Sequence, residues 1–268
     1  MINPGDSKTQ TIEQQLAAAV ELISTQWLRR LAVLPWVRLH EEPDVVWVFS
    51  GDTWPGNSVG HARFRPTAAH RRIGEILAQH WEHKVACNWV VGPVSQPANL
   101  SKHLKDHGFS CRIHCAGMAC DLTGLGEQPP LPPGVTIELV DELPSLVPLT
   151  TQRRKDRHRG RNLIAKQQPR TAWYFSASCD DKSVGETILF NGEGAAGIYD
   201  VEVMEKFRRR GIGSALIYKA LQHAKKLGQK AAVLGATGMG SGVYARLGFR
   251  ELCKLSFWKY GKMRQHRF

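Results

Sequence analysis

Hydrophobic positions in the first half of the chain switch between helical and extended spacing. Apolar residues recur every three to four positions over residues 12–31, which predicts an amphipathic helix, and Thr11 with Gln14 makes a capping-box pattern at its start. A β-branched and aromatic run predicts a buried strand over 44–50. The remaining pattern predicts strands over 59–64 and 88–91, helices over 68–80 and 99–107, and two short strands between 109 and 122.

The second half repeats this rhythm. The pattern predicts strands over 135–140, 173–178, 184–190, 196–203 and 231–234, and helices over 143–166, 214–227 and 242–247. A last strand over 250–260 is expected to close the sheet. The alternation of strands and helices is typical of an α/β fold.

Residues 124–134 are rich in proline and glycine and have neither helical nor strand periodicity, so we interpret them as a linker. We expect a first domain over residues 1–123 and a second over residues 135–268. Both halves contain a helix that ends in glycine and phenylalanine, at Gly108-Phe109 and at Gly248-Phe249. We interpret this shared ending as internal duplication, and the alternative is a coincidence of two similar helix ends.

The positive charge of the chain is unevenly distributed. The chain carries 36 Lys and Arg against 24 Asp and Glu, a net charge of +12. Residues 1–134 hold 12 basic and 12 acidic side chains, so the whole excess lies in the second half. An anionic partner for that half is therefore expected.

The six cysteines form no C-x-x-C pair and fit no zinc spacing, so we expect free thiols and no metal. No apolar run approaches the ~20 residues of a membrane span, and the start of the chain has no signal-peptide pattern. These features predict a cytoplasmic protein without membrane contact.

Residues 208–213, with the sequence Arg-Arg-Arg-Gly-Ile-Gly, carry the clearest candidate chemistry. The two glycines allow a tight turn that brings several backbone N–H groups close to a phosphate, and the predicted helix beyond them directs its positive N-terminus to the same point. Three guanidinium groups add charge and paired donors. The segment predicts a pyrophosphate site, although R-x-x-G-x-G alone is a weak motif.

Together with its neighbours, this loop resembles motifs A and B of the GNAT N-acetyltransferase superfamily. The matching residues are Arg208, Gly211 and Gly213 for R-x-x-G-x-G, Val201 and Val203 for the preceding strand, and Tyr244, Gly248 and Phe249 for the Tyr-x-x-x-Gly-Phe ending. The first half resembles, more distantly, the degenerate module of two-module members. The resemblance implies a tandem GNAT-like α/β fold with mixed, mostly antiparallel sheets flanked by helices.

The resemblance also implies a site for acetyl-CoA or another acyl-CoA as co-substrate. Backbone groups of Val201 and Val203 would bind the pantetheine arm, and Thr237 would bond the pantetheine or adenosine side. Tyr244 would protonate the leaving thiolate, since a phenol with a reference pKa of ~10 is a suitable acid for a thiol of ~8.5. The implied cofactor-binding residues are Val201, Glu202, Val203, Arg208, Arg209, Arg210, Gly211, Ile212, Gly213, Ser214, Thr237 and Tyr244.

The general base is less well defined. The position where the family often has a glutamate is Gly197, which cannot act. Glu202 is the candidate base, but strand alternation places it and Asp200 on the face opposite Val201 and Val203 unless a bulge rotates the strand. The alternatives are a purely structural Glu202 and deprotonation through water.

We expect acyl transfer, most simply of acetyl, to a primary amine of a small molecule by direct attack on the thioester. The basic run over residues 153–161 indicates an anionic acceptor, or a macromolecular partner such as tRNA, a protein amine or an acyl-carrier protein; its alternative is a solvated helix face. A non-catalytic CoA-binding module is a further alternative, because Gly197 stands where the family often has the glutamate. The first half lacks the loop and is not expected to bind acyl-CoA. Both a monomer and a homodimer are compatible with the sequence.

Overall fold

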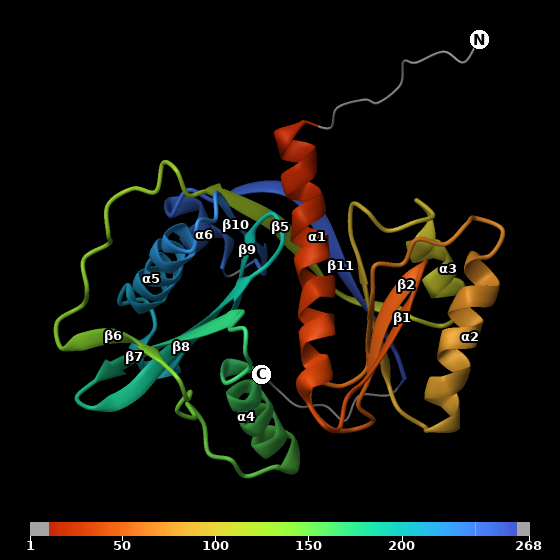
Figure 1. Ribbon diagram of the computed structural model, residues 1–268, viewed down its shortest axis with the longest axis horizontal. Helices are drawn as coiled ribbons and strands as arrows, with labels where there is room; N and C mark the ends of the chain where they lie inside the picture. The colour runs from red at the N-terminus through yellow and green to blue at the C-terminus, as the bar shows by residue number, and fades with distance from the viewer. Residues whose placement is uncertain (1–10, 239, 262–268) are drawn as a thin grey trace.

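The computed structural model describes residues 11–238 and 240–261. In these residues one mixed sheet of eleven strands runs through both halves, in the order β1-β2-β3-β4-β11-β5-β10-β9-β8-β7-β6 (Figure 1). The elements of the first half are α1 (Ile12–Arg30), β1 (Arg38–Glu42), β2 (Val45–Phe49), β3 (Ser58–Gly60), α2 (Ala69–Glu82), β4 (Cys87–Val91), α3 (Leu100–Asp106) and β5 (Ser110–Asp121). Those of the second half are β6 (Val135–Val140), α4 (Gln152–Ala165), β7 (Ala172–Cys179), β8 (Lys182–Asn191), β9 (Ala196–Val203), α5 (Ile212–Lys226), β10 (Ala231–Ala236), α6 (Ser241–Arg246) and β11 (Arg250–Tyr260).

The last strand of each half lies beside a strand of the other half. β5 pairs antiparallel with β10, and β11 pairs antiparallel with β4 as well as with β5. The prediction that residues 250–260 close the sheet is therefore wrong, because this strand lies in the interior of the sheet. Residues 110–121 form one long strand and not two short ones, since β5 has β10 as a neighbour on one side and β11 on the other.

The two faces of the sheet are covered by different helices. On β7, Trp173 and Phe175 pack in the core beneath α5, and Tyr174 between them packs with Ile164 of α4 in the core on the opposite face. In the first half, α2 and α3 bury their apolar side chains against Trp47 and its neighbours. The alternation of side chains along each strand produces these two layers of core.

Helix α1 joins the two halves (Figure 1). Thr11 caps it as predicted: the Thr11 hydroxyl accepts a hydrogen bond from the Gln14 N–H at 3.2 Å, and the Thr11 N–H donates to the Gln14 side chain at 3.0 Å. Its buried face contributes to two cores, one with Leu28 and one with Val20 and Ile23. Among the described residues, no helix has the length and apolar character needed to cross a membrane.

Candidate functional site

Strands β9 and β10 run side by side only where they begin. Ala196 pairs with Ala232 and Gly197 with Val233, in parallel. Beyond these pairs β10 continues beside β5, and β9 continues beside β8 as far as Val203. In the described part of the chain, the later backbone groups of β9 that face β10 thus have no partner in β10. A ligand with an extended chain of amides can bind there as an additional strand.

The loop between β9 and α5 has the geometry of an anion cradle. Arg209 and Gly211 both have left-handed backbone conformations, with φ of +60° and +85°. Such turns make successive N–H groups converge, and here they precede the N-terminus of a 15-residue helix. Arg208 Nε donates to the Val203 carbonyl oxygen at 3.0 Å, which fixes the loop to the end of β9. Arg209 and Arg210 stay exposed to solvent, where they can meet a phosphate.

The segment after β10 supplies two further predicted residues. Thr237 is exposed, and its carbonyl oxygen accepts hydrogen bonds from the N–H groups of Gly240 at 2.9 Å and Ser241 at 3.2 Å, at the start of α6. Tyr244 lies on α6 and packs edge-on against Phe249, with ring centroids 5.9 Å apart. Burial raises the pKa of Tyr244, so its phenol is protonated at neutral pH and can donate a proton.

A bulge in β9 separates the apolar and acidic side chains of this strand. Glu186 on β8 pairs with Glu202, and Ile188 pairs with Tyr199, so β9 contains one residue more than β8 over this stretch. Asp200 within it has a left-handed φ of +48°. Val201 and Val203, in consequence, pack with the core beneath α5, and Glu202 reaches a guanidinium of α4.

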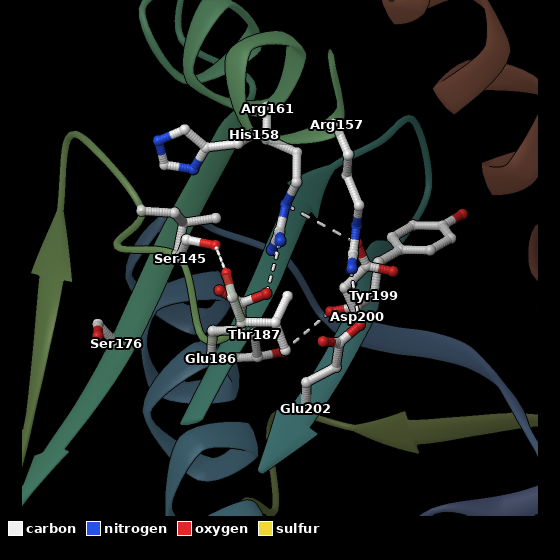
Figure 2. A network of polar contacts seen from close by, with 12 residues as sticks. Ser145, Arg157, His158, Arg161, Ser176, Glu186, Thr187, Tyr199, Asp200 and Glu202 are labelled. Atoms are coloured by element: carbon white, nitrogen blue, oxygen red, sulfur yellow. Dashed lines mark hydrogen bonds and ion pairs between the residues drawn. The ribbon is translucent and has the colours of Figure 1, made fainter. Parts of the chain in front are cut away.

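The acidic side chains of β8 and β9 form ion pairs with two arginines one turn apart on α4 (Figure 2). Arg157 Nη2 donates to Glu202 at 2.6 Å and to Asp200 at 3.1 Å. Arg161 Nη1 donates to Glu186 at 2.5 Å, and the exposed fractions of these two side chains are only 7% and 3%. Burial raises the pKa of Glu186 although Arg161 opposes the shift. The cluster holds three carboxylates against two guanidiniums, which leaves an excess of negative charge beside β9.

Helix α1 of the first half occupies the space next to Gly197. A Cβ atom at Gly197 would lie 2.7 Å from Cγ1 of Ile23 and 2.8 Å from a ring carbon of Tyr199. Trp27 of α1 stacks on Tyr199, with ring centroids 5.6 Å apart and planes at 22°. The packed side chains of α1 thus explain why no larger residue stands at this position of β9.

Most arginines of the basic run at the start of α4 contact other groups of the same chain. Arg153 donates to the carbonyl oxygens of Asp52 and Pro55, both at 3.3 Å, and Arg154 donates to that of Pro148 at 3.2 Å. Arg159 lies over the Trp36 ring at 5.1 Å, and the two arginines further along are held by the acidic cluster. These contacts tie α4 to the first half and weaken the case for an anionic partner at this helix.

The counterpart of the β9–β10 opening in the first half is closed by the chain itself. β3 and β4 pair in parallel over two positions only. Beyond them the Gln96 N–H donates to the Ala62 carbonyl oxygen at 2.8 Å, and the Phe64 N–H donates to the Gln96 carbonyl oxygen at 3.1 Å. The backbone groups that a ligand would use are therefore already paired. In the described ranges, no group of three or more His, Cys, Asp or Glu side chains could hold a metal ion.

Comparisons with known proteins agree with this geometry. Residues 139–249 match the Acetyltransferase (GNAT) family. A GCN5-related N-acetyltransferase from Kribbella flavida is similar with a TM-score of 0.66 and 17% identity, over 95% of this chain and 98% of that chain. A tandem GNAT protein from the clavulanic acid biosynthesis pathway has a TM-score of 0.60 and 17% identity, over 95% of each chain. A GCN5-related N-acetyltransferase from Sphaerobacter thermophilus has a TM-score of 0.55 and 18% identity, over 93% of each chain. No curated protein matches the sequence.

The second half of the chain thus carries an acetyltransferase domain of the GNAT family, and the whole chain has the fold of a tandem GNAT protein. The resemblance indicated by the motifs is therefore confirmed for residues 139–249, which form a GNAT acetyltransferase domain. GNAT enzymes use acetyl-CoA as co-substrate, and their acceptors vary.

The sequence did not reveal several residues around the opening. Arg157 and Arg161 were visible only as part of a basic run, and their spacing of four residues was the signal that one helix face carries both. Glu186 is a single carboxylate in an apolar strand, which is the pattern of a buried ion pair. Ile23 and Trp27 gave no signal, because they look like ordinary positions on the apolar face of α1.

Proposed function

We propose that this protein transfers an acetyl group from acetyl-CoA to a primary amine of a small molecule, by direct attack of the amine on the thioester. The observation that carries the proposal is the divergence of β9 and β10 next to the anion cradle at the start of α5. The diverging strands offer unpaired edges for the pantetheine arm, and the anion cradle offers converging N–H groups for the pyrophosphate. Their order along β9 matches the order of these groups in CoA.

In the proposed complex the N–H groups of residues 209–214 hold the pyrophosphate, with Arg209 and Arg210 as charged partners. The edge of β9 at Val201 and Val203 binds the pantetheine amides. The Val203 carbonyl oxygen already accepts a hydrogen bond from the Arg208 side chain, so other backbone groups of β9 would make this pairing. Thr237 lies at the opposite side of the opening, after β10.

The proposed chemistry needs two proton transfers. The neutral amine attacks the thioester carbonyl carbon, the C–S bond of the tetrahedral intermediate breaks, and Tyr244 donates its proton to the departing sulfur. Burial keeps the Tyr244 phenol protonated, as this role requires. We assign Glu202 as the carboxylate that accepts the proton of the amine, through water. The carboxylate excess around Asp200 and Glu202 favours an acceptor that is cationic in water over an anionic one.

Release of free thiol from acetyl-CoA with a panel of primary amines tests the proposal. Tyr244→Phe is expected to lower kcat by about 10²- to 10⁴-fold, the range of a lost general acid, while the Kd for acetyl-CoA changes little. Tyr260→Phe is the matched control, because this tyrosine lies at the end of β11 beside β4. Binding of acetyl-CoA without thiol release for any amine would contradict the proposed transfer and favour a non-catalytic CoA-binding module. Full activity of Tyr244→Phe would overturn the role assigned to the phenol.

A further inference from the structure

Basic side chains from separate elements meet where the two halves of the chain join. Lys259 of β11 lies opposite Asn88 of β4, so the last strand of the second half carries it into the first half. Its neighbours Trp258 and Tyr260 pack in the core beneath α2, so Lys259 projects from the other face of the sheet, on which α4 lies. Arg112 is the additional residue of β5 where this strand bulges beside Trp258.

Arg153, at the start of α4, reaches the same place. A Cβ atom at Gly56 would lie 3.5 Å from Arg153 Nη2 and 4.0 Å from Asn88 Nδ2. The Arg153 guanidinium is thus close to the strand position opposite Lys259. Burial lowers the pKa of Lys259, and the nearby charges of Arg112 and Arg153 lower it as well. We call Arg112, Arg153 and Lys259 the basic patch.

The charges of the basic patch are not neutralised within residues 11–238 and 240–261. None of its three side chains forms an ion pair with an Asp or Glu of these residues. Arg153 donates to the carbonyl oxygens of Asp52 and Pro55, which fix its position but leave its charge uncompensated. Like charges that lie close together destabilise a fold, and an anion bound between them would remove this repulsion.

Helix α4 places the basic patch next to the acidic cluster of β9. Arg153 and Arg157 are four residues apart, so they lie on one face of α4 with Cβ atoms about 5–6 Å apart. Arg157 forms ion pairs with Asp200 and Glu202 (Figure 2), whereas Arg153 reaches the junction of the two halves. An excess of carboxylates and an excess of cations therefore adjoin along one helix. This arrangement complements a molecule that is positive at one end and negative at the other.

We propose that the acceptor is an ω-amino acid, a primary amine whose carbon chain ends in a carboxylate. This inference rests on the proposed function, in which Glu202 accepts the proton of the amine. The ammonium end binds beside Asp200 and gives its proton to Glu202 through water. The carboxylate end binds Lys259 and Arg112, with the charge of Arg153 beside them. The two clusters lie about one helical turn of 5.4 Å apart, which suits charges at the two ends of a carbon chain better than the adjacent charges of an α-amino acid.

Three amines of equal chain length test this class of acceptor. 5-Aminopentanoate ends in a carboxylate, pentylamine in a methyl group and 1,5-diaminopentane in a second ammonium. Thiol release from acetyl-CoA gives kcat/KM for each amine in the wild-type protein and in Lys259→Met, Arg112→Met and Lys254→Met. Lys254 is the matched control, because it is on the same strand between Cys253 and Leu255, which pack with α1, so it projects from the opposite face to Lys259.

The wild-type protein is expected to prefer 5-aminopentanoate over pentylamine by at least about tenfold in kcat/KM, the effect of one hydrogen bond between charged groups, and to use 1,5-diaminopentane least. Lys259→Met and Arg112→Met should each remove most of this preference, and Lys254→Met should keep it.

Three results would overturn the ω-amino acid while the proposed function stands. They are equal kcat/KM for 5-aminopentanoate and pentylamine in the wild type, a full preference in both Lys259→Met and Arg112→Met, and turnover of other primary amines without turnover of 5-aminopentanoate. If no primary amine supports thiol release, both proposals fail.

Discussion

Removal of Arg161 alone should destabilise the protein strongly, because its partner Glu186 would remain buried without the countercharge that it bonds. The two side chains are 7% and 3% exposed and lie 2.5 Å apart, so water cannot replace the missing guanidinium. Breaking a buried pair in this way typically costs about 3–5 kcal/mol, against a total stability of about 5–15 kcal/mol. Arg161→Met is the appropriate change, since it keeps most of the volume of the side chain.

The double variant Arg161→Met/Glu186→Leu provides the decisive comparison. Replacing both ions removes the cost of taking them out of water as well as their attraction, and such replacements are often neutral or stabilising. We therefore expect the double variant to be more stable than Arg161→Met alone by about 3 kcal/mol. The deficit of Arg161→Met should also shrink as the pH is lowered. Arg161 holds the pKa of Glu186 down against the effect of burial, so its removal raises this pKa further, and the folded variant takes up a proton at a higher pH than the wild-type protein does.

Urea denaturation at pH 7.5 and at pH 5.5, followed by tryptophan fluorescence, measures these free energies of unfolding. If Arg161→Met lowers the free energy of unfolding by less than about 1 kcal/mol, the Arg161–Glu186 pair contributes no more than an exposed ion pair, which would refute the reasoning from its burial. A double variant that is no more stable than the single one would refute it as well. Arg154→Met is the control, because its guanidinium bonds only to exposed groups near the start of α4.

Two further predictions concern the packing of α1. Gly197→Ala should lower the free energy of unfolding by about 1–3 kcal/mol, since the new methyl group would overlap Ile23. Gly124→Ala is the control and should have little effect, because the space around Gly124 is open. Equal effects of the two substitutions in urea denaturation would contradict this prediction. Glu21, whose pKa is raised by burial, accepts hydrogen bonds from the Val94 N–H at 2.7 Å and the Ser95 hydroxyl at 2.6 Å. The pKa of Glu21 is higher in the folded protein than in the unfolded chain, so the wild-type protein should gain stability relative to Glu21→Gln as the pH falls from 7 toward 5. A difference in free energy of unfolding between the two proteins that stays constant over this range would show that Glu21 does not titrate in the folded state.

The sequence predicted those parts of the fold that depend on local pattern. The capping box of α1, the strand after the linker and the helix after the glycine loop were visible because periodicity and capping are short-range properties. The pyrophosphate loop was visible for the same reason. The strand over Arg38–Glu42 was missed, since its polar side chains give no alternation and only pairing with β2 makes it a strand.

Long-range pairing could not be read from the sequence. Residues 250–260 could pair only with strands of their own half or could also pair with β4. Both arrangements have the same alternation of apolar and polar residues, and the choice depends on strands that lie far away along the chain. The bulge at Asp200 is likewise fixed by the register with β8, and it decides that Glu202 meets Arg157. The acidic cluster follows from this register together with the position of α4, and neither is a local property.

Binding of acetyl-CoA depends most directly on the anion cradle at the start of α5, and Gly213→Asp tests this dependence. A side chain at Gly213 would meet only Val203 at 3.8 Å, an ordinary contact, and an aspartate in the first turn of a helix is compatible with its dipole. The variant should therefore fold normally, while its carboxylate repels the pyrophosphate. Calorimetric titration with acetyl-CoA should show one site per chain in the wild-type protein and in Gly124→Asp, and at least about tenfold weaker binding in Gly213→Asp. Equal affinity in all three proteins, or no binding to the wild type at millimolar acetyl-CoA, would contradict the account.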